Sequence, residues 1–142
     1  SLNDHFSREP IKEKKVLVVG IDGVRPDSLI KAKTPNLDSL IKNGSVTYNS
    51  YAGGNIGTET QQATSSGPGW SSILTGVWTN KHGVTDNSFS NRNYEEYPHF
   101  FKRLKEHDSS FFLSSFVQWT PIHTYILSDA DEFGNGSDDS AF

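Results

Sequence analysis

A run of hydroxyl side chains in a glycine-rich loop is the part of this sequence best suited to chemistry. The hydroxyls and the loop residues after them are Thr64, Ser65, Ser66, Gly67, Pro68 and Gly69. An amphipathic segment follows, which predicts a helix from Pro68 to about Thr75. A serine at this place is either a plain turn residue or a nucleophile held at a helix N-terminus. There, backbone N–H groups and a partial positive charge favour a phosphoryl or sulfuryl oxygen.

Asp22 is the second residue of a type that performs chemistry, and we pair it with Ser66. A serine hydroxyl is a weak nucleophile until a base or a metal ion takes its proton, and no histidine stands beside Ser66 in the sequence. A divalent metal ion is therefore the more economical activator, with Asp22 as one oxygen ligand. Gly67 and Gly69 would let a substrate approach the backbone closely. On these features alone a plain turn is favoured, because short motifs often occur without function.

The elements that must position these residues alternate between strands and helices. Residues 14–22 are a β-branched run typical of a strand buried on both faces of a parallel sheet. Asp22 ends this run, at the edge where open α/β sheets bind ligands. The other predicted elements are a helix at 34–45, a strand at 46–52, the helix after Gly67, a helix at 97–108, a strand at 110–117 and a helix at 120–128. This order predicts a layered α/β/α fold around a central, largely parallel sheet.

Length and composition fit one globular domain. The chain has 142 residues, enough for a buried core, and its 12% aromatic residues argue against disorder. We expect a polar N-terminal arm at 1–14 and a catalytic domain at 15–142. The acidic tail from Asp129 onward is expected to be solvated, because it lacks the complete ligand pattern of a calcium loop.

Charge and cysteine content exclude several classes of partner and site. The net charge of −4 and the absence of a long basic stripe argue against nucleic acid as a bulk partner. The longest apolar run, at 16–21, is too short to span a membrane. The chain has no cysteine, which excludes disulfides and thiolate zinc sites. That absence is consistent with a periplasmic or secreted bacterial protein and does not establish one.

Three motifs together resemble a known enzyme family. They are VLVVGIDGVRPDSL, TPNLDSLIKNG and SSGPGWSSILTGVWTNKHGVTDN, in this order within residues 15–90. They resemble the N-terminal part of the alkaline phosphatase superfamily, in its type I phosphodiesterase and nucleotide pyrophosphatase branch. The most specific part is T-G-x(5)-H-G at Thr75, Gly76, His82 and Gly83. The resemblance places Ser66 at the nucleophile position of the family and gives His82 a structural place in a turn.

The resemblance implies an alkaline phosphatase-like fold and a metal-dependent hydrolase of small phosphodiesters or nucleotide pyrophosphates. It implies two divalent metal ions, usually zinc, with Asp22 as the first carboxylate ligand and Ser66 beside a metal. Ser66 would attack phosphorus in line and form a phosphoenzyme that water resolves. Trp70 is a candidate wall of the substrate site or a core residue. Asn87 is a candidate substrate contact or a turn residue.

Two alternative functions remain open at this point. Sulfatases of the same superfamily carry C/S-x-P-x-R, which begins here with Ser66, but Trp70 stands where the arginine should be. A function of another class is a non-catalytic module that binds sugars or other planar ligands through Trp70, Trp78 and Trp119. Glycan titration followed by tryptophan fluorescence distinguishes this module from the enzyme.

The resemblance also implies that the chain is incomplete as a catalyst. The other metal ligands of the family lie downstream of its nucleophile, and one carried-over carboxylate ligand is too few for a tight metal site. We therefore expect an N-terminal fragment that is poorly active or inactive by itself. The missing C-terminal part of the domain would leave unpaired strand edges, which favour self-association.

Overall fold

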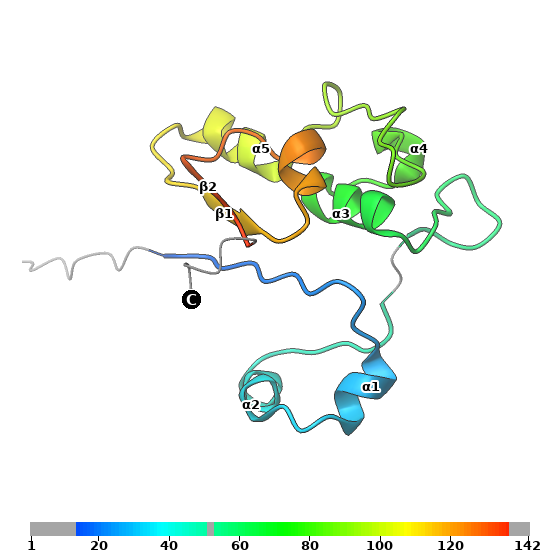
Figure 1. Cartoon of the computed structure of the whole chain (residues 1–142), viewed down its shortest axis with the longest axis vertical. Coiled ribbons are helices and arrows are strands. Elements are labelled where there is room, and N and C mark those ends of the chain that lie inside the picture. Colours follow the sequence, from blue (N-terminus) through cyan, green and yellow to red (C-terminus); the bar gives the residue numbers. More distant parts are fainter. Residues whose placement is uncertain (1–13, 51–52, 137–142) are drawn as a thin grey trace, which may run out of the picture. The chain divides into compact units, whose positions relative to one another are not determined.

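A computed structural model describes residues 14–50 and 53–136 and divides the chain into two compact units, Ser1–Ser45 and Val46–Phe142 (Figure 1). Each unit is described by itself. The predicted N-terminal arm lies outside the described residues except for Lys14. The assignment of 15–142 to one catalytic domain stays a prediction.

The first unit contains two short helices, α1 (Pro26–Lys31) and α2 (Pro35–Asn43). Each begins with proline at its first turn, where the missing N–H costs nothing. Each also has an acidic residue in that turn, Asp27 or Asp38, which complements the helix dipole. The helix predicted at 34–45 is confirmed as α2, with Thr34 as its N-cap residue. Helix α1 was not predicted.

The predicted strand at 14–22 is wrong. The segment has no strand assignment, and the side chains of Val16 and Leu17 are 88% and 86% exposed. A strand exists only as one side of a hydrogen-bonded ladder, and within the described residues no strand pairs with this segment. The strand predicted at 46–52 is also not formed over 46–50, while 51–52 lie outside the described residues.

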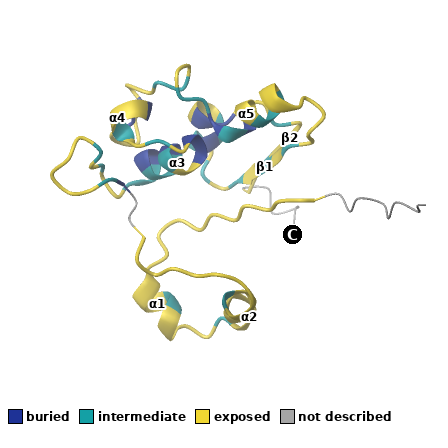
Figure 2. Ribbon diagram, turned by 180° about the vertical axis from the view of Figure 1, so that it is seen from behind, coloured by how far each residue is buried: buried dark blue, intermediate teal, exposed yellow. Residues whose placement is uncertain are grey.

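The second unit contains the helices α3 (Ser66–Thr75), α4 (Thr79–His82) and α5 (Phe100–His107). Helix α5 confirms the helix predicted at 97–108, and the helix predicted from Pro68 begins two residues earlier. The buried apolar side chains of this unit form one cluster: Leu74, Val84, Phe89, Phe101, Ile122, Ile126 and Leu127. Figure 2 shows the buried residues along α3 and near α5.

A two-stranded parallel sheet completes the second unit. Strand β1 (Ser114–Val117) pairs with β2 (Glu132–Asn135), and the connection between them contains a π-helical turn, η1 (Ile122–Ile126). Strand β1 confirms the last four residues of the strand predicted at 110–117. The helix predicted at 120–128 is this π-helical turn, and its N-cap residue is Pro121.

Strand β2 is an element that was not predicted, and in it Glu132–Asn135 of the acidic tail are paired in the sheet. Three of its four residues are exposed, so the expectation of a solvated tail is not contradicted there. Asp131, just before β2, holds the strand in place. Its carboxylate accepts the Leu113 N–H at 2.7 Å and lies 2.8 Å from the Lys105 ammonium. The α/β class is therefore confirmed, with a small parallel sheet. The larger layered sheet of an alkaline phosphatase-like fold, and self-association through open strand edges, stay predictions.

Candidate functional site

Ser66 is the first residue of α3, as the loop sequence predicted for a residue at a helix N-terminus. Ser65 precedes it as the N-cap residue, with extended backbone angles (φ −114°, ψ 161°). The first bond inside the helix runs from the Gly69 N–H to the Ser65 carbonyl at 3.1 Å. Ser66 is partly buried, and it stands in the first turn of α3, where backbone N–H groups lack partners inside the helix.

Burial distinguishes the hydroxyl of Ser65 from that of Ser66 as a candidate nucleophile. The Ser65 Oγ has less than 1 Å² of accessible surface, and among the described residues it has no hydrogen-bond partner. A hydroxyl closed off from solvent cannot meet a dissolved substrate. Ser66 is therefore the better-placed nucleophile of the two.

Asn87 binds the start of α3 from 20 residues away. The Gly67 N–H donates to the Asn87 Oδ1 at 2.7 Å, which satisfies one of the helix N–H groups that lack a partner inside the helix. A Cβ at Gly67 would lie 2.5 Å from the Asp86 carbonyl oxygen, so the chain itself makes the close approach at this glycine. A Cβ at Gly69 would meet nothing within 4 Å. The roles of these three residues in substrate binding stay predictions.

Gln62 is a residue of this region that the sequence analysis missed. Its Nε2 donates to the Pro68 carbonyl at 3.2 Å, and its Oε1 accepts from Ser72 Oγ at 3.0 Å and from the Thr79 N–H at 3.2 Å. One side chain thus joins the loop before Ser66 to both α3 and the start of α4. Gln62 is one of two adjacent glutamines in a polar loop, and no sequence pattern predicts these contacts.

The two glycines of the T-G-x(5)-H-G motif each end a helix. Gly76 ends α3 and Gly83 ends α4, both in the left-handed region at φ 75°. A Cβ at Gly83 would collide with the Asn91 carbonyl, so this position requires glycine on two counts. The motif therefore fixes the turn that carries the chain from α3 through α4.

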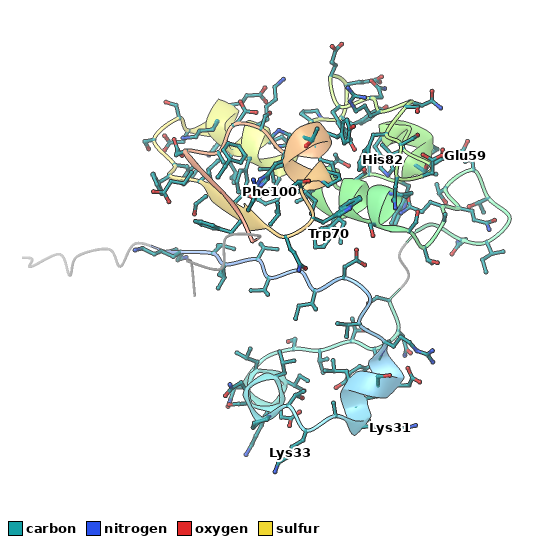
Figure 3. The ribbon with its side chains drawn as sticks, in the orientation of Figure 1. Lys31, Lys33, Glu59, Trp70, His82 and Phe100 are labelled. Carbon is teal, nitrogen blue, oxygen red and sulfur yellow. The ribbon has the colours of Figure 1, made fainter. Side chains whose placement is uncertain are left out.

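His82 is fully buried in this turn, and Figure 3 labels it beside α4. Its Nδ1 accepts the Val84 N–H at 3.0 Å, and its Nε2 lies 3.0 Å from the Ser72 Oγ. Since Nδ1 accepts, the neutral ring carries its proton on Nε2 and donates it to Ser72. Burial lowers the pKa of His82 from its ordinary value of 6.5. Both ring nitrogens are engaged, which supports the structural role implied by the resemblance.

Trp70, also labelled in Figure 3, is partly buried on α3 and packs against the hydrophobic cluster. Trp119 packs against the same cluster, with its ring centroid 6.0 Å from that of Phe89. These contacts favour a core role for both tryptophans. Trp78, the third tryptophan of the sugar-binding hypothesis, is 39% exposed.

Asp22 lies in the first unit, in a turn with Gly23, which has φ 76°. Its side chain is exposed, and it does not end a strand as predicted. Ser66 belongs to the second unit, so the predicted proximity of Asp22 to Ser66 stays a prediction.

The donor set does not make a complete metal site. Over 14–50 and 53–136, no group of three or more His, Cys, Asp or Glu side chains comes together in a way that could hold a metal ion. Asp22 and Ser66 would offer two oxygen ligands, fewer than the three or more that a tightly held catalytic metal needs. The two-zinc site therefore stays a prediction.

Two pockets of the second unit do not include the serine. One of about 270 Å³ and one of about 460 Å³ are lined by residues between Ser90 and Ser128, and Ser66 lines neither.

In the part of the chain that the structure describes, no helix is long and apolar enough to cross a membrane.

Comparison with known proteins gives one match. A family model described as type I phosphodiesterase / nucleotide pyrophosphatase matches residues 16–130. This range includes Asp22, the serine loop and the T-G-x(5)-H-G turn. No curated protein and no solved structure matches the chain.

Proposed function

Because the chain belongs to the type I phosphodiesterase / nucleotide pyrophosphatase family, a hydrolase family, we propose that Ser66 is its catalytic nucleophile. The observation that carries the proposal is the contrast within the loop: Ser66 opens α3 and is partly exposed, while the Ser65 Oγ is buried. Substrates would be phosphodiesters or nucleotide pyrophosphates, as the family description states.

The surroundings of Ser66 support a phosphoryl ligand. Backbone N–H groups at the start of a helix of ten residues favour anionic oxygens. The Asn87 Oδ1 accepts from Gly67, which brings the Asn87 amide next to the nucleophile and leaves its Nδ2 group as a donor for a phosphate oxygen. Gly69 leaves open space on the same turn.

In the proposed reaction, the Ser66 Oγ attacks phosphorus opposite the leaving oxygen. The Oγ–P bond forms as the bond from phosphorus to the leaving oxygen breaks, and the proton of the Ser66 hydroxyl passes through solvent to that oxygen. Water then attacks phosphorus of the covalent intermediate, the Oγ–P bond breaks as Oγ takes back a proton from that water, and a phosphate monoester leaves. His82 does not serve as the base, because Ser72 and Val84 already occupy its two ring nitrogens.

The proposal includes dependence on divalent metal ions, zinc by family resemblance, with Asp22 as one ligand. Two oxygen donors are too few to hold the ions, so this dependence requires further ligands besides Asp22 and Ser66. The sulfatase alternative gains no support, because Trp70, at the place of its arginine, packs against the core.

The test is hydrolysis of an aryl phosphodiester, measured on the 142-residue chain and on the product of its whole coding sequence. In the form that turns over, we expect Ser66→Ala to lower kcat by about a thousandfold or more, as for loss of a nucleophile. Ser65→Ala is the matched control and should keep kcat within about twofold. A chelator should abolish turnover, and zinc should restore it. Full activity in Ser66→Ala would refute the assignment.

A further inference from the structure

We infer that Gln62 is a positioning residue for Ser66, an inference that rests on the proposed function. The evidence is the set of contacts made by this one side chain. Its amide donates to the Pro68 carbonyl in the first turn of α3, two residues after Ser66. The same amide oxygen accepts from Ser72, further along α3, and from Thr79, which begins α4.

The loop that carries Gln62 is closed at its base. The Gly54 N–H donates to the Thr60 carbonyl at 2.9 Å, and a Cβ at Gly54 would collide with the Thr60 side chain. Gly53 packs directly on Gln62, whose Cγ lies 2.6 Å from where a Cβ at Gly53 would be. Gln62 therefore connects a closed loop, rather than a loose strand of chain, to the helix that presents the nucleophile.

A second amide side chain holds the same turn from another segment. Asn87 accepts from the Gly67 N–H while Gln62 donates to the Pro68 carbonyl. The two residues that follow Ser66 are thus each fixed by a side chain from outside the helix. Side chains that fix a catalytic group in this way set its position to within fractions of an ångström.

The contacts of Gln62 also continue into the buried interior. Ser72 Oγ donates to Gln62 Oε1 and lies 3.0 Å from His82 Nε2. Loss of the Gln62 amide would leave the Ser72 hydroxyl and the Pro68 carbonyl without these partners. Such a loss loosens the first turn of α3, and a displacement of about 1 Å in a reacting group can lower a rate about a hundredfold.

Gln61 provides a matched control in the same loop. Its Oε1 accepts from the Gly57 N–H at 2.7 Å, a contact internal to the loop. Gln61→Ala and Gln62→Ala remove the same group from neighbouring positions. Only the second breaks the connection to α3.

The first measurement is amide hydrogen exchange at Gly69, whose N–H makes the first bond inside α3. We expect Gln62→Ala to speed this exchange by about tenfold or more and Gln61→Ala by less than about twofold, since local opening follows the loss of hydrogen bonds. Equal exchange rates in the two variants would overturn the inference, whether or not the chain turns over.

The second measurement is kinetic, in the form that hydrolyses the aryl phosphodiester. Gln62→Ala should lower kcat by about ten- to a hundredfold with little change in KM, because it disturbs the nucleophile and not the binding of substrate. Gln62→Glu keeps the acceptor for Ser72 and Thr79 but loses the donor to Pro68, so kcat should fall while the unfolding midpoint stays near that of the parent chain. Unchanged kcat in both variants refutes the positioning role.

The Ser66→Ala variant separates the two hypotheses. If Ser66→Ala is inactive and Gln62→Ala is fully active, the nucleophile assignment holds and the positioning role of Gln62 fails. If Ser66→Ala is active, the proposed function itself fails.

Discussion

Both units of the chain contain apolar residues, but among the described residues only the second unit buries them. Between Lys14 and Ser45, no described residue is buried, although the run at 16–21 is among the most apolar in the chain. In the second unit, Phe89 and Val84 are 0% and 1% exposed, and seven apolar side chains form one cluster. An apolar run therefore becomes part of a hydrophobic core only where another element packs on it.

The same difference applies to the two proposed site residues. Ser66 sits on a helix that packs into the core, and its neighbours are held by hydrogen bonds from the preceding loop, through Gln62, and from Asn87, 20 residues after Gly67. Asp22 sits in an exposed turn of a unit with two helices of six and nine residues. Helices of this length gain little stability by themselves.

Removal of a core aromatic ring should have the largest effect on stability. Phe89 is stacked on Tyr125 with ring centroids 4.7 Å apart. We expect Phe89→Ala to lower the free energy of unfolding by about 3–5 kcal/mol. Leu17→Ala, at a side chain 86% exposed, should change it by less than about 0.5 kcal/mol. Urea unfolding measures both, and similar losses would contradict the contrast between the units.

The left-handed glycines give a sharper comparison, because their backbone angles are nearly identical. We expect Gly83→Ala to cost about 2–4 kcal/mol, from strain plus the collision with the Asn91 carbonyl. Gly76→Ala, at the same φ of 75° in open space, should cost about 1–2 kcal/mol.

Gly23→Ala extends this test to the first unit. Gly23 has φ 76° and open space around it, but it lies outside the packed cluster. We expect the unfolding midpoint of the second unit to stay unchanged in this variant. A loss equal to that of Gly76→Ala would show that the two units unfold together.

The Asn87 contact should have a moderate effect. Asn87→Ala removes the acceptor for the Gly67 N–H, and loss of a helix N-terminal acceptor costs about 0.5–2 kcal/mol. Asn87→Asp keeps an acceptor and adds a negative charge at the positive end of α3, so its stability should stay near that of the parent chain. Chemical denaturation of the three proteins checks this order.

The smallest expected effect is a dependence of stability on pH that belongs to the second unit. Burial lowers the pKa of His82 and of His99 from 6.5, so below pH 6.5 the unfolded chain binds more protons than the folded one. The free energy of unfolding is therefore highest above pH 6.5 and falls as the pH drops toward the folded-state pKa values.

This pH dependence has a simple control. The first unit has His5, which lies outside the described residues, so the slope that arises from burial belongs to histidines of the second unit. His82→Gln should reduce the slope, with His99 and His123, whose pKa values burial also lowers, supplying what remains. An unchanged slope in that variant would show that His82 does not titrate as its burial requires.

Local patterns predicted local structure well. The helices α2, α3 and α5 follow from apolar residues at helical spacing, and Ser66 was placed at a helix start because glycine and proline come directly after it. The strand at 14–22 failed for the opposite reason. A β-branched run favours a strand, but a strand forms only where another segment pairs with it.

The sequence by itself determined the family, the helices α2, α3 and α5 and the left-handed glycines of the T-G-x(5)-H-G turn, because each depends on residues within a few positions of one another. Tertiary structure alone decided that Asn87 and Gln62 fix the turn after Ser66, and that Glu132–Asn135 pair with Ser114–Val117. These contacts join separate segments of chain. Their formation depends on the packing that closes the loops between them, which no local pattern encodes.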